Sequence, residues 1–369
     1  MIIESLLLEN FRNYARQEIS FSEGRNVITG RNAQGKSNLL ESIYFLSHLR
    51  SNRAPRLREL VMDGQERSTA RGTVRDGDER LGLKVEFGQK GRSVELNGQK
   101  FASAAKAKGI LKCVLFSPED LYLVKGDPGR RRDFLDETME ELGPVPASLL
   151  NQYRHVLRQR NALLKKWEEQ GSGLQSAMEP WTEALVKAGA AILVQRAMML
   201  EGMAPMLAEA YRDIAGEEIG LKAAYRATAP AQGDAEEVSR SLREAITRSS
   251  SEEKRARTTL VGPHRDDVEI ELGGRAARFA ASQGEQRTIA FCLRVAQKKY
   301  LFEQTGKMPV LLLDDVLSEL DEGRRTRVLE QVGVKGQAII TTTELPGSLA
   351  RAGDTVFVVR DGKVTVEQP

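Results

Sequence analysis

Cysteines, long apolar runs and a strong excess of one charge are all missing from this chain of 369 residues. Its two cysteines, Cys113 and Cys292, cannot form a framework of disulfide bridges. Both lie among apolar neighbours, so we expect buried free thiols and a reducing compartment. Without a run of about eighteen apolar residues, no membrane span is predicted. Glu4, Glu9 and Arg12 interrupt the apolar N-terminus, so we expect no signal peptide and a cytoplasmic location.

The net charge of +3 excludes a globally basic body, so any nucleic-acid contact must come from local patches. A hydrophobic content of 40 % and a charged content of 29 % predict a soluble globular protein with a sizeable core. The length suits two domains, or one large domain with an insertion. The sequence has no internal repeat and no low-complexity tract.

The stretch from Gly30 to Ser37 matches the phosphate-binding loop pattern G-x-x-x-x-G-K-[ST]. A short apolar strand sequence precedes it, and apolar residues at helical spacing follow it. In such a setting, backbone N–H groups cradle phosphate, the lysine reaches the β- and γ-phosphates, and the serine ligates Mg²⁺. We therefore expect nucleotide binding. The expected contacts are Gly30, Arg31, Asn32, Ala33, Gln34, Gly35, Lys36, Ser37 and Asn38.

A second motif could complete such a site. Val310 to Leu313 form an apolar strand sequence that runs into Asp314 and Asp315. The end of a central strand would place Asp314 beside the phosphate loop, where it can hold Mg²⁺. Asp315 can then orient or deprotonate the attacking water. The alternative is an ordinary strand that ends in a turn.

Nearly the whole chain separates these two motifs, which indicates an insertion between them. We predict an α/β fold, with a mixed sheet and an antiparallel β subdomain in the ATPase head, and an inserted mainly helical domain. The expected halves of the head are residues 1–116 and 256–369, and the helical arm covers 117–255. Within the head, a strand pair is expected over 1–22 and an antiparallel meander over 68–101. Two long helices, near Leu149–Trp167 and Trp181–Tyr211, should form a hairpin.

Ser282 and Gly284 open a further predicted helix, whose N-terminus could bind an anion. One nucleotide would not need two such sites in the same molecule. This one makes sense if it closes on the phosphate bound by a second copy of the chain. The loop from Ser318 to Asp321 would then lie at the same dimer seam. A simple helix cap is the alternative.

The order of these motifs resembles the ATP-binding-cassette heads of the SMC-like type, and several stretches narrow the resemblance to the RecF family. These stretches are Leu8 to Tyr14, Asn38 to Tyr44, Phe116 to Leu121, Val124 to Pro128, Arg131 to Asp136, Leu260 to Asp267 and Ser282 to Arg287. The similarity covers the chain from end to end, and the motifs are specific only when they are taken together.

This resemblance implies an ATP-dependent homodimer that binds gapped DNA or single–double-strand junctions. It also implies partners RecR and RecO, an indirect role in loading RecA, and slow, DNA-stimulated ATP hydrolysis. By motif, Lys36 and Asp315 would be catalytic, and Ser37 and Asp314 would hold Mg²⁺. Arg12 and Asn13 would line the base or ribose. An ATPase subunit of a transporter and a nucleotide-gated scaffold with negligible hydrolysis are the competing interpretations.

Some residues depart from the pattern of the family or stay ambiguous. Ala33 stands where glycine is usual, which matters only if its φ is positive. Thr341 to Thr343 lie where transporter-type heads carry a switch histidine, and His264 is interpreted as a loop histidine bonded to backbone. Arg130, Arg131 and Arg132 are expected to pair with Glu137, Glu140 and Glu141 in preference to DNA. Candidates for DNA contact on charge alone are Arg50, Arg53, Arg56, Lys106, Lys108 and Lys112.

Overall fold

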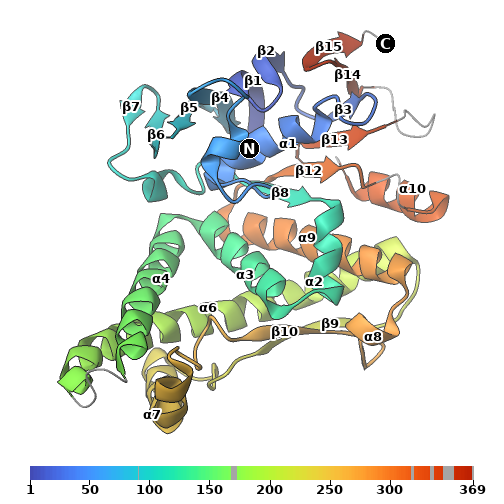
Figure 1. The fold of residues 1–369 in the computed structure, drawn as a ribbon. Helices are drawn as coiled ribbons and strands as arrows, with labels where there is room; N and C mark the ends of the chain where they lie inside the picture. Colours follow the sequence, from blue (N-terminus) through green and yellow to red (C-terminus); the bar gives the residue numbers. More distant parts are fainter. Residues whose placement is uncertain (90, 168–172, 317–319, 333–335, 344–352, 368–369) are drawn as a thin grey trace.

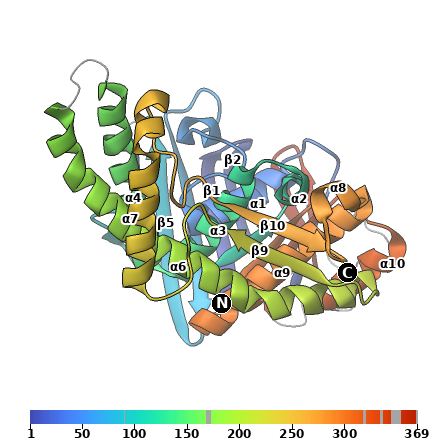
Figure 2. The same ribbon diagram turned by 90° about the horizontal axis from the view of Figure 1, so that it is seen from below.

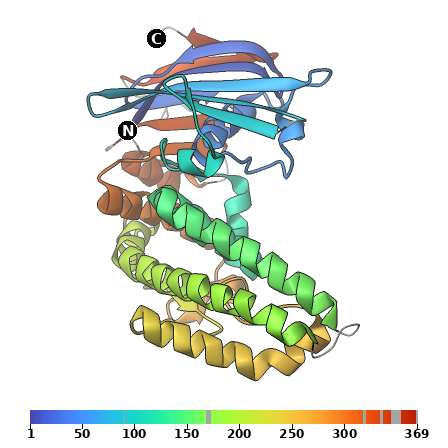
Figure 3. The same ribbon diagram turned by 90° about the vertical axis from the view of Figure 1, so that its left-hand side faces the viewer.

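The computed structural model describes residues 1–89, 91–167, 173–316, 320–332, 336–343 and 353–367. Two β-sheets lie together at one end of the molecule, and a mainly helical part forms the other end (Figure 1). Seen from the side, helices α4, α6 and α7 are stacked beneath the sheets (Figure 3). The expected α/β head with a helical region is therefore present.

The first sheet is antiparallel, with strand order β2-β1-β4-β5-β6-β7. Leu83, Val85 and Phe87 of β5 are buried and alternate with less buried neighbours, as a sheet with one covered face requires. The predicted strand pair and meander are confirmed. The strands are β1 (Ile2–Phe11), β2 (Tyr14–Ser20), β4 (Arg67–Asp76), β5 (Glu79–Gly88), β6 (Gly91–Leu96) and β7 (Gln99–Lys100).

The second sheet has the order β15-β14-β3-β13-β12-β8 and is parallel except for β15. Every residue of β8, β12 and β13 is buried, because both faces of these strands are covered. Their carboxyl ends and that of β3 therefore meet at one edge. The strands are β3 (Arg25–Thr29), β8 (Cys113–Phe116), β12 (Val310–Asp314), β13 (Ala338–Thr342), β14 (Thr355–Arg360) and β15 (Lys363–Glu367).

Helix α1 (Lys36–His48) contacts strands of both sheets, so its apolar residues join the two into one core. Leu39, Ile43 and Leu46 are fully buried there. Cys113 and Cys292 are buried free thiols, as predicted. Among the described residues, no helix is long and apolar enough to cross a membrane.

The helical part contains the predicted hairpin, formed by α4 (Pro144–Lys165) and α6 (Leu174–Ala215). Helix α6 continues through Pro180 and Pro205 over 42 residues. The other helices that precede residue 257 are η1 (Leu57–Leu60), η2 (Ala104–Ala107), η3 (Pro118–Asp120), α2 (Leu121–Lys125), α3 (Pro128–Leu142) and α7 (Ala235–Ala256).

A small third sheet crosses the expected boundary at residue 255, and the strand that it takes from residues 221–226 is absent from the mainly helical prediction. It pairs β9 (Leu221–Arg226) with β10 (Asp267–Leu272) and ends in β11 (Arg275–Ala276). The two long strands lie side by side in Figure 2. Because β9 contains two alanines and little apolar alternation, only its pairing with β10 makes it a strand.

The last helices are α8 (Ala277–Ala280), α9 (Gln283–Thr305) and α10 (Glu322–Gln331). Helix α8 follows β11 directly. Helix α9 packs along α6, and one apolar core unites both with strands of the second sheet. The division into 1–116, 117–255 and 256–369 stays a prediction.

Candidate functional site

The phosphate-loop sequence forms a tight turn between β3 and the start of α1. Gly30, Ala33 and Gly35 all have positive φ, at 150°, 63° and 118°. A Cβ at Gly35 would lie 2.6 Å from Asn13 Nδ2, and one at Gly30 would lie 2.4 Å from the carbonyl oxygen of Val359. Glycine is therefore needed at both ends, whereas Ala33 occupies a left-handed conformation that is unfavourable for alanine.

Lys36, the first residue of α1, turns its ammonium group back onto this turn. Its Nζ donates hydrogen bonds to the carbonyl oxygens of Gly30, at 2.6 Å, and Arg31, at 2.9 Å. Burial lowers the pKa of Lys36, while the carboxylates of Asp315 and Asp314 act in the opposite direction. The positive charge is thus held where the loop would receive phosphate. A cavity of about 700 Å³ adjoins the loop and is lined in part by Gly30, Arg31 and Thr343.

Asp314, at the end of β12, lies directly beside the helix that follows the loop. Ser37 Oγ donates to Asp314 Oδ1 at 2.8 Å, and Thr341 Oγ1 donates to the same oxygen at 2.9 Å. Burial raises the pKa of Asp314, and these two hydrogen bonds work against that effect. Ser37 and Asp314 are 277 positions apart, and the shared edge of the parallel sheet brings them together. Their two hard oxygen donors fit a Mg²⁺ ion.

Asp315 follows in a left-handed conformation with a φ of 50°. Its backbone N–H donates to Thr341 Oγ1 at 2.9 Å, so one threonine hydroxyl orients both acidic residues. Sequence reasoning noted Thr341 only as a replacement for a histidine and missed this role. The signal was available only in the pairing of β12 with β13, which places Thr341 opposite Asp314.

On the opposite side of the loop, Asn13 Nδ2 donates to Gln34 O and Asn38 Nδ2 donates to Asn13 Oδ1, both at 2.9 Å. Arg12 is less available than expected. Its guanidinium forms two hydrogen bonds with Glu41, at 3.0 and 2.8 Å, and a third with Glu59 O at 2.7 Å. Asn13 thus lies beside the loop, whereas the guanidinium of Arg12 is bound to Glu41 of α1 and to the carbonyl oxygen of Glu59.

Exposed residues of the loop itself complete this surface. The side chains of Arg31, Asn32 and Ala33 are exposed. Gln34 is held by the β14–β15 turn, because its Oε1 accepts from the backbone N–H of Asp361 at 2.5 Å. The contact with the C-terminal hairpin was not foreseen from the sequence.

Ser282 and Gly284 lie on another part of the molecule, at the first turn of α9. Ser282 is the N-cap, and its backbone N–H donates to Glu285 Oε2 at 2.7 Å in a capping box. The side chain of Arg324, from α10, lies against Gly284. Within the part of the chain that the structure describes, this turn contacts α9 and α10 and not the phosphate loop. Ser318 and Glu319 of the predicted seam lie outside the described residues, and Asp321 caps α10.

Several basic candidates for DNA contact are engaged inside the protein. Lys112 is buried and its Nζ donates to Glu141 O, while Lys108 Nζ lies 2.8 Å from Glu140 Oε2. Arg50 Nη2 lies 4.0 Å from carboxylate oxygens of both Glu137 and Glu140. Arg53 and Arg56 are exposed and remain candidates, and the side chain of Lys106 lies outside the described part.

The predicted pairing of Arg130 to Arg132 with the glutamates of α3 is wrong in its partners. Arg131 forms a bidentate pair with Asp267, at 2.6 and 3.0 Å, and Arg132 donates to Asp266 O. Both arginines therefore fasten α3 to β10 and its preceding loop. Arg130 is exposed. Successive side chains of a helix point in different directions, so residues that are close in sequence need not contact one another.

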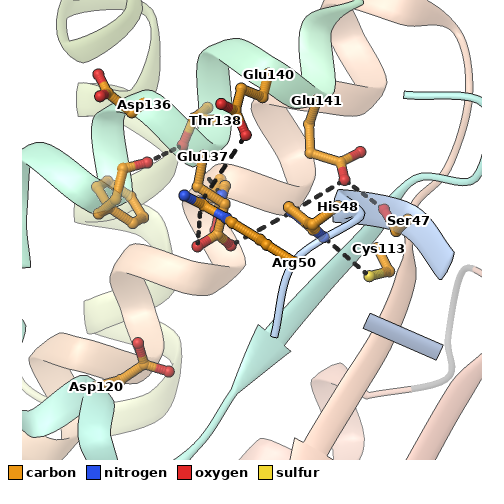
Figure 4. A network of polar contacts seen from close by, with 12 residues as sticks. Ser47, His48, Arg50, Cys113, Asp120, Asp136, Glu137, Thr138, Glu140 and Glu141 are labelled. Carbon is orange, nitrogen blue, oxygen red and sulfur yellow. Dashed lines mark hydrogen bonds and ion pairs between the residues drawn. The ribbon is translucent and has the colours of Figure 1, made fainter. Parts of the chain in front are cut away.

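The α3 glutamates instead belong to a buried network below the end of α1 (Figure 4). Arg294 of α9 donates to Glu137 at 2.8 Å and to Asp120 at 2.7 Å. His48 Nε2 lies 3.1 Å from Glu141 Oε1, which also accepts from Ser47 Oγ at 2.6 Å. Burial lowers the pKa of His48 to about 4 and raises that of Glu141 to about 8, so both are held in neutral forms near pH 7.

His264 has the expected structural role. Its Nε2 contacts Thr259 O at 3.1 Å and its Nδ1 contacts the hydroxyl of Tyr153 at 2.7 Å. Burial lowers its pKa to about 4. The prediction of a loop histidine bonded to backbone is confirmed.

The fold and the loop geometry define a P-loop ATPase head of the SMC-like, ATP-binding-cassette type. A sequence model described as the RecF/RecN/SMC N-terminal domain matches residues 2–365. Proteins named DNA replication and repair protein RecF are similar over the full chain. One from Symbiobacterium thermophilum is 40 % identical over 375 residues, covering 100 % of this chain and 99 % of its own. Another, from Cyanothece sp., is 39 % identical over 347 residues, with 94 % and 92 % covered.

Solved structures agree. One titled as the recombination mediator protein RecF-ATPrS in the RecFOR pathway has a TM-score of 0.92 at 34 % identity, covering 100 % of this chain and 98 % of its own. One titled RecF-ATP has a TM-score of 0.91 at 35 % identity, covering 99 % and 97 %. An Smc head with its ScpA partner shares the fold, with a TM-score of 0.58 at 18 % identity and coverage of 100 % and 97 %. The chain belongs to the RecF family.

Proposed function

We propose that this protein is an ATP-gated, DNA-binding ATPase of recombinational repair and replication restart. One observation carries the proposal: Ser37 and Asp314 meet at 2.8 Å beside a loop that is shaped to bind phosphate. The names of the relatives, which are DNA replication and repair proteins, support the biological role. The solved relatives include RecF-ATP and RecF-ATPrS, which supports ATP as the nucleotide.

In this proposal, the backbone of residues 30–35 and Lys36 bind the phosphates of ATP, and Ser37 and Asp314 hold Mg²⁺. The ion neutralises charge on the β- and γ-phosphates. Asp315 orients a water molecule and accepts its proton, because its carboxylate is close enough to the loop for its charge to act on the pKa of Lys36. Hydrolysis is slow and is stimulated by DNA, so that bound ATP acts as a timer.

A second copy completes the site. Ser282 is exposed and Gly284 is half-buried in the first turn of α9, and in the dimer they close on the γ-phosphate held by the other copy. The loop of one copy and the turn of the other thus sandwich the nucleotide, and ATP binding produces the homodimer. The dimer binds gapped DNA or single–double-strand junctions, and with RecR and RecO it promotes the loading of RecA.

The DNA-contacting surface includes Arg53 and Arg56, which follow α1 and are exposed. Arg53 Nη1 also donates to Asn38 Oδ1 at 3.1 Å, so DNA contact there is directly coupled to the nucleotide site. Because lysine and arginine contacts to phosphate release counterions, DNA affinity should fall steeply with salt.

Sedimentation of the protein with and without ATP tests this proposal. We expect monomers without nucleotide and dimers with it. Lys36→Met should abolish nucleotide binding. Ser282→Arg should keep nucleotide binding and lose dimerisation, because the larger side chain blocks the turn. A monomer that is unchanged at saturating ATP would refute the gated dimer. The same experiment with gapped and fully duplex DNA tests junction preference.

A scaffold with negligible hydrolysis is the second candidate. Single-turnover hydrolysis of the Asp315→Asn variant separates the two functions. A large decrease supports the ATPase, and an unchanged, already negligible rate supports the scaffold. A transporter subunit is disfavoured because the family is RecF and because Thr341 binds the acidic pair where a switch histidine would stand.

A further inference from the structure

Arg324, in the first turn of α10, lies against the first turn of α9. A Cβ built on Gly284 would lie only 2.8 Å from Arg324 Nη1. Gly284 is not among the residues with positive φ, so its backbone conformation does not require glycine. The nearest atom is the tip of a flexible side chain, which can shift, so this distance shows how close the guanidinium lies to the turn and not a need for glycine. A positive charge thus stands beside the backbone at position 284.

The guanidinium of Arg324 is only loosely held. Its Nε lies 3.5 Å from Asp321 Oδ2, which is an ion-pair distance longer than a hydrogen bond, and the side chain is 23 % exposed. Asp321 is itself occupied in capping α10, where its Oδ1 accepts from the backbone N–H of Arg324 at 2.9 Å. The described contacts therefore leave the guanidinium able to bind an anion from outside.

The surroundings of Ser282 favour an anionic ligand. Hydrogen bonds with Ser282 lower the pKa of Glu285, and the charges of Arg324 and Arg275 lower it further, which places both guanidinium groups near this turn. Arg275 and Arg278 are exposed. The N-terminal dipole of the 23-residue helix α9 adds to their field. Glu285 and Asp321 offset only part of this positive charge.

We propose that Arg324 is supplied in trans and binds the γ-phosphate of the nucleotide held by a second copy of this chain. This inference rests on the proposed ATP-gated dimer. Ser282 and the backbone at Gly284 contact one side of the phosphate, and the planar guanidinium contacts two of its oxygens. Water forms the new bond to phosphorus as the bond to the bridging oxygen breaks. ADP leaves with that electron pair, and the water proton passes to Asp315. Arg324 stabilises the negative charge on the transferred group.

The first test measures three properties of an Arg324→Ala variant. Nucleotide binding by the monomer should stay within about twofold of the original protein, because the phosphate loop of the same copy is intact. The single-turnover hydrolysis rate should fall by at least about a hundredfold, a modest loss for an arginine supplied in trans. Arg324→Lys should restore part of the rate, since it returns the charge without the planar fork.

Arg278→Ala is the matched control. It removes an exposed arginine from the same corner, and this guanidinium stacks over Phe279 at 5.5 Å rather than lying at Gly284. Its hydrolysis rate should change by less than about threefold, the effect of an exposed charge. Equal losses in the two variants would show a general effect of charge and would overturn the specific role of Arg324.

A mixing experiment tests the action in trans. Asp315→Asn and Arg324→Ala proteins are each defective alone. In a mixed dimer, one site combines the intact Asp315 of the Arg324→Ala copy with the intact Arg324 of the other. Hydrolysis should therefore rise when the two are mixed, and Ser282→Arg in the Asp315→Asn copy should prevent the rise. No rise, although sedimentation shows mixed dimers, would assign Arg324 to its own copy and overturn the inference.

The failure of this inference and that of the proposed function are distinguishable. If the unmodified protein stays monomeric in ATP, the gated dimer is wrong. If it dimerises and hydrolyses ATP while Arg324→Ala does so at the same rate, only the role of Arg324 is wrong. Thermal melting of each variant verifies that it is folded before the rates are compared.

Discussion

Helix α1 has a group of charged side chains at each end, and the two groups differ in almost every physical respect. At its start, Lys36 and Ser37 face Asp314 and Asp315 at the edge of a sheet. At its end, His48 lies in a fully buried network with the glutamates of α3 (Figure 4). The first group sits on strained backbone, with positive φ at Ala33 and Asp315. The second takes most of its residues from α1, α3 and α9.

The side chains at the two ends of α1 also differ in how many charged partners they have, and this difference indicates the role of each group. Glu137 and Asp120 both bind Arg294, and Glu140 has Lys108 and Arg154 within ion-pair distance. These charges balance one another inside the protein, so they hold α1, α3 and α9 together. Lys36, in contrast, donates hydrogen bonds to two neutral carbonyl oxygens. A charge balanced by neutral groups is suited to an incoming anion, whereas a saturated network is suited to structure.

Breaking the buried group should have the largest effect. Arg294→Ala leaves Glu137 and Asp120 buried without their main partner, so unfolding should become easier by about 3–5 kcal/mol. Chemical denaturation measures this loss. Arg248→Ala, on the exposed face of α7 with a side chain that is 69 % exposed, is the control and should change stability by less than about 0.5 kcal/mol. Equal effects of both substitutions would contradict the structural role of the network.

Removing the charge of Lys36 at the start of α1 should leave the stability of the protein nearly unchanged but greatly weaken ATP binding. Lys36→Met should weaken ATP binding by at least about a hundredfold, because charged hydrogen bonds to phosphate are lost. The free energy of unfolding without nucleotide should change by about 1 kcal/mol or less. Titration with a fluorescent ATP analogue and denaturation curves measure the two effects. A destabilisation as large as that of Arg294→Ala would erase the contrast between the two ends.

The buried network should also give the protein a distinctive dependence on pH. The pKa of Glu141 is raised to about 8, so above its unfolded value near 4.5 the folded state binds more protons than the unfolded state. Stability due to Glu141 is complete below pH 4.5 and is lost as pH rises through 8. The Glu141→Gln variant has no carboxyl group to ionise at this position, so it should not show this loss of stability. The original protein should therefore lose about 1–2 kcal/mol relative to the variant between pH 6.5 and 8.

Measurement above pH 6.5 isolates this effect. His48, with a pKa lowered to about 4, contributes stability that is complete above pH 6.5 and is lost as pH falls toward 4. Its contribution is thus constant in the chosen window. Parallel stability curves for the original protein and Glu141→Gln from pH 6.5 to 8 would show that Glu141 is ionised in the folded state.

The smallest effect concerns strain in the loop. Ala33 has a φ of 63°, a conformation that costs alanine about 1–2 kcal/mol and glycine much less. Ala33→Gly relieves this strain but adds freedom to the unfolded chain, so a net gain of about 0.5 kcal/mol is expected. Differential denaturation detects it. A loss of about 1 kcal/mol, as in an ordinary helix, would mean that the loop is unstrained.

Much of the nucleotide site could be predicted from the sequence. The glycines and lysine of residues 30–37 identify a loop whose conformation few other residues permit. The apolar run before Asp314 predicts a central strand. In the structure this strand is β12, and one strand, β13, lies between it and β3. Thr341 and Asp361 were not predicted as support for the site, because their contacts depend on which strands and loops lie side by side, and these are 27 and 327 positions apart in the sequence.

The charged residues of α3 show where sequence reasoning failed. Glu137, Glu140 and Glu141 were assigned to arginines a few positions away. In the structure Arg294 reaches Glu137, Arg154 and Lys108 reach Glu140, and His48 reaches Glu141, all from other elements. Strand β9 was missed for the same reason, since its pairing partner lies across the predicted domain boundary. Both errors concern interactions between segments that are distant in sequence.

The sequence by itself determined the local geometry of this protein: a phosphate-binding turn, an acidic strand end and a capped helix at Ser282. Such features follow from backbone conformation and side-chain spacing within a few residues. Only the tertiary structure decided which charges serve the ligand and which hold the fold. The reason is physical: the state of a buried charge depends on its desolvation and its partners, and both are set by the packing of elements far apart along the chain.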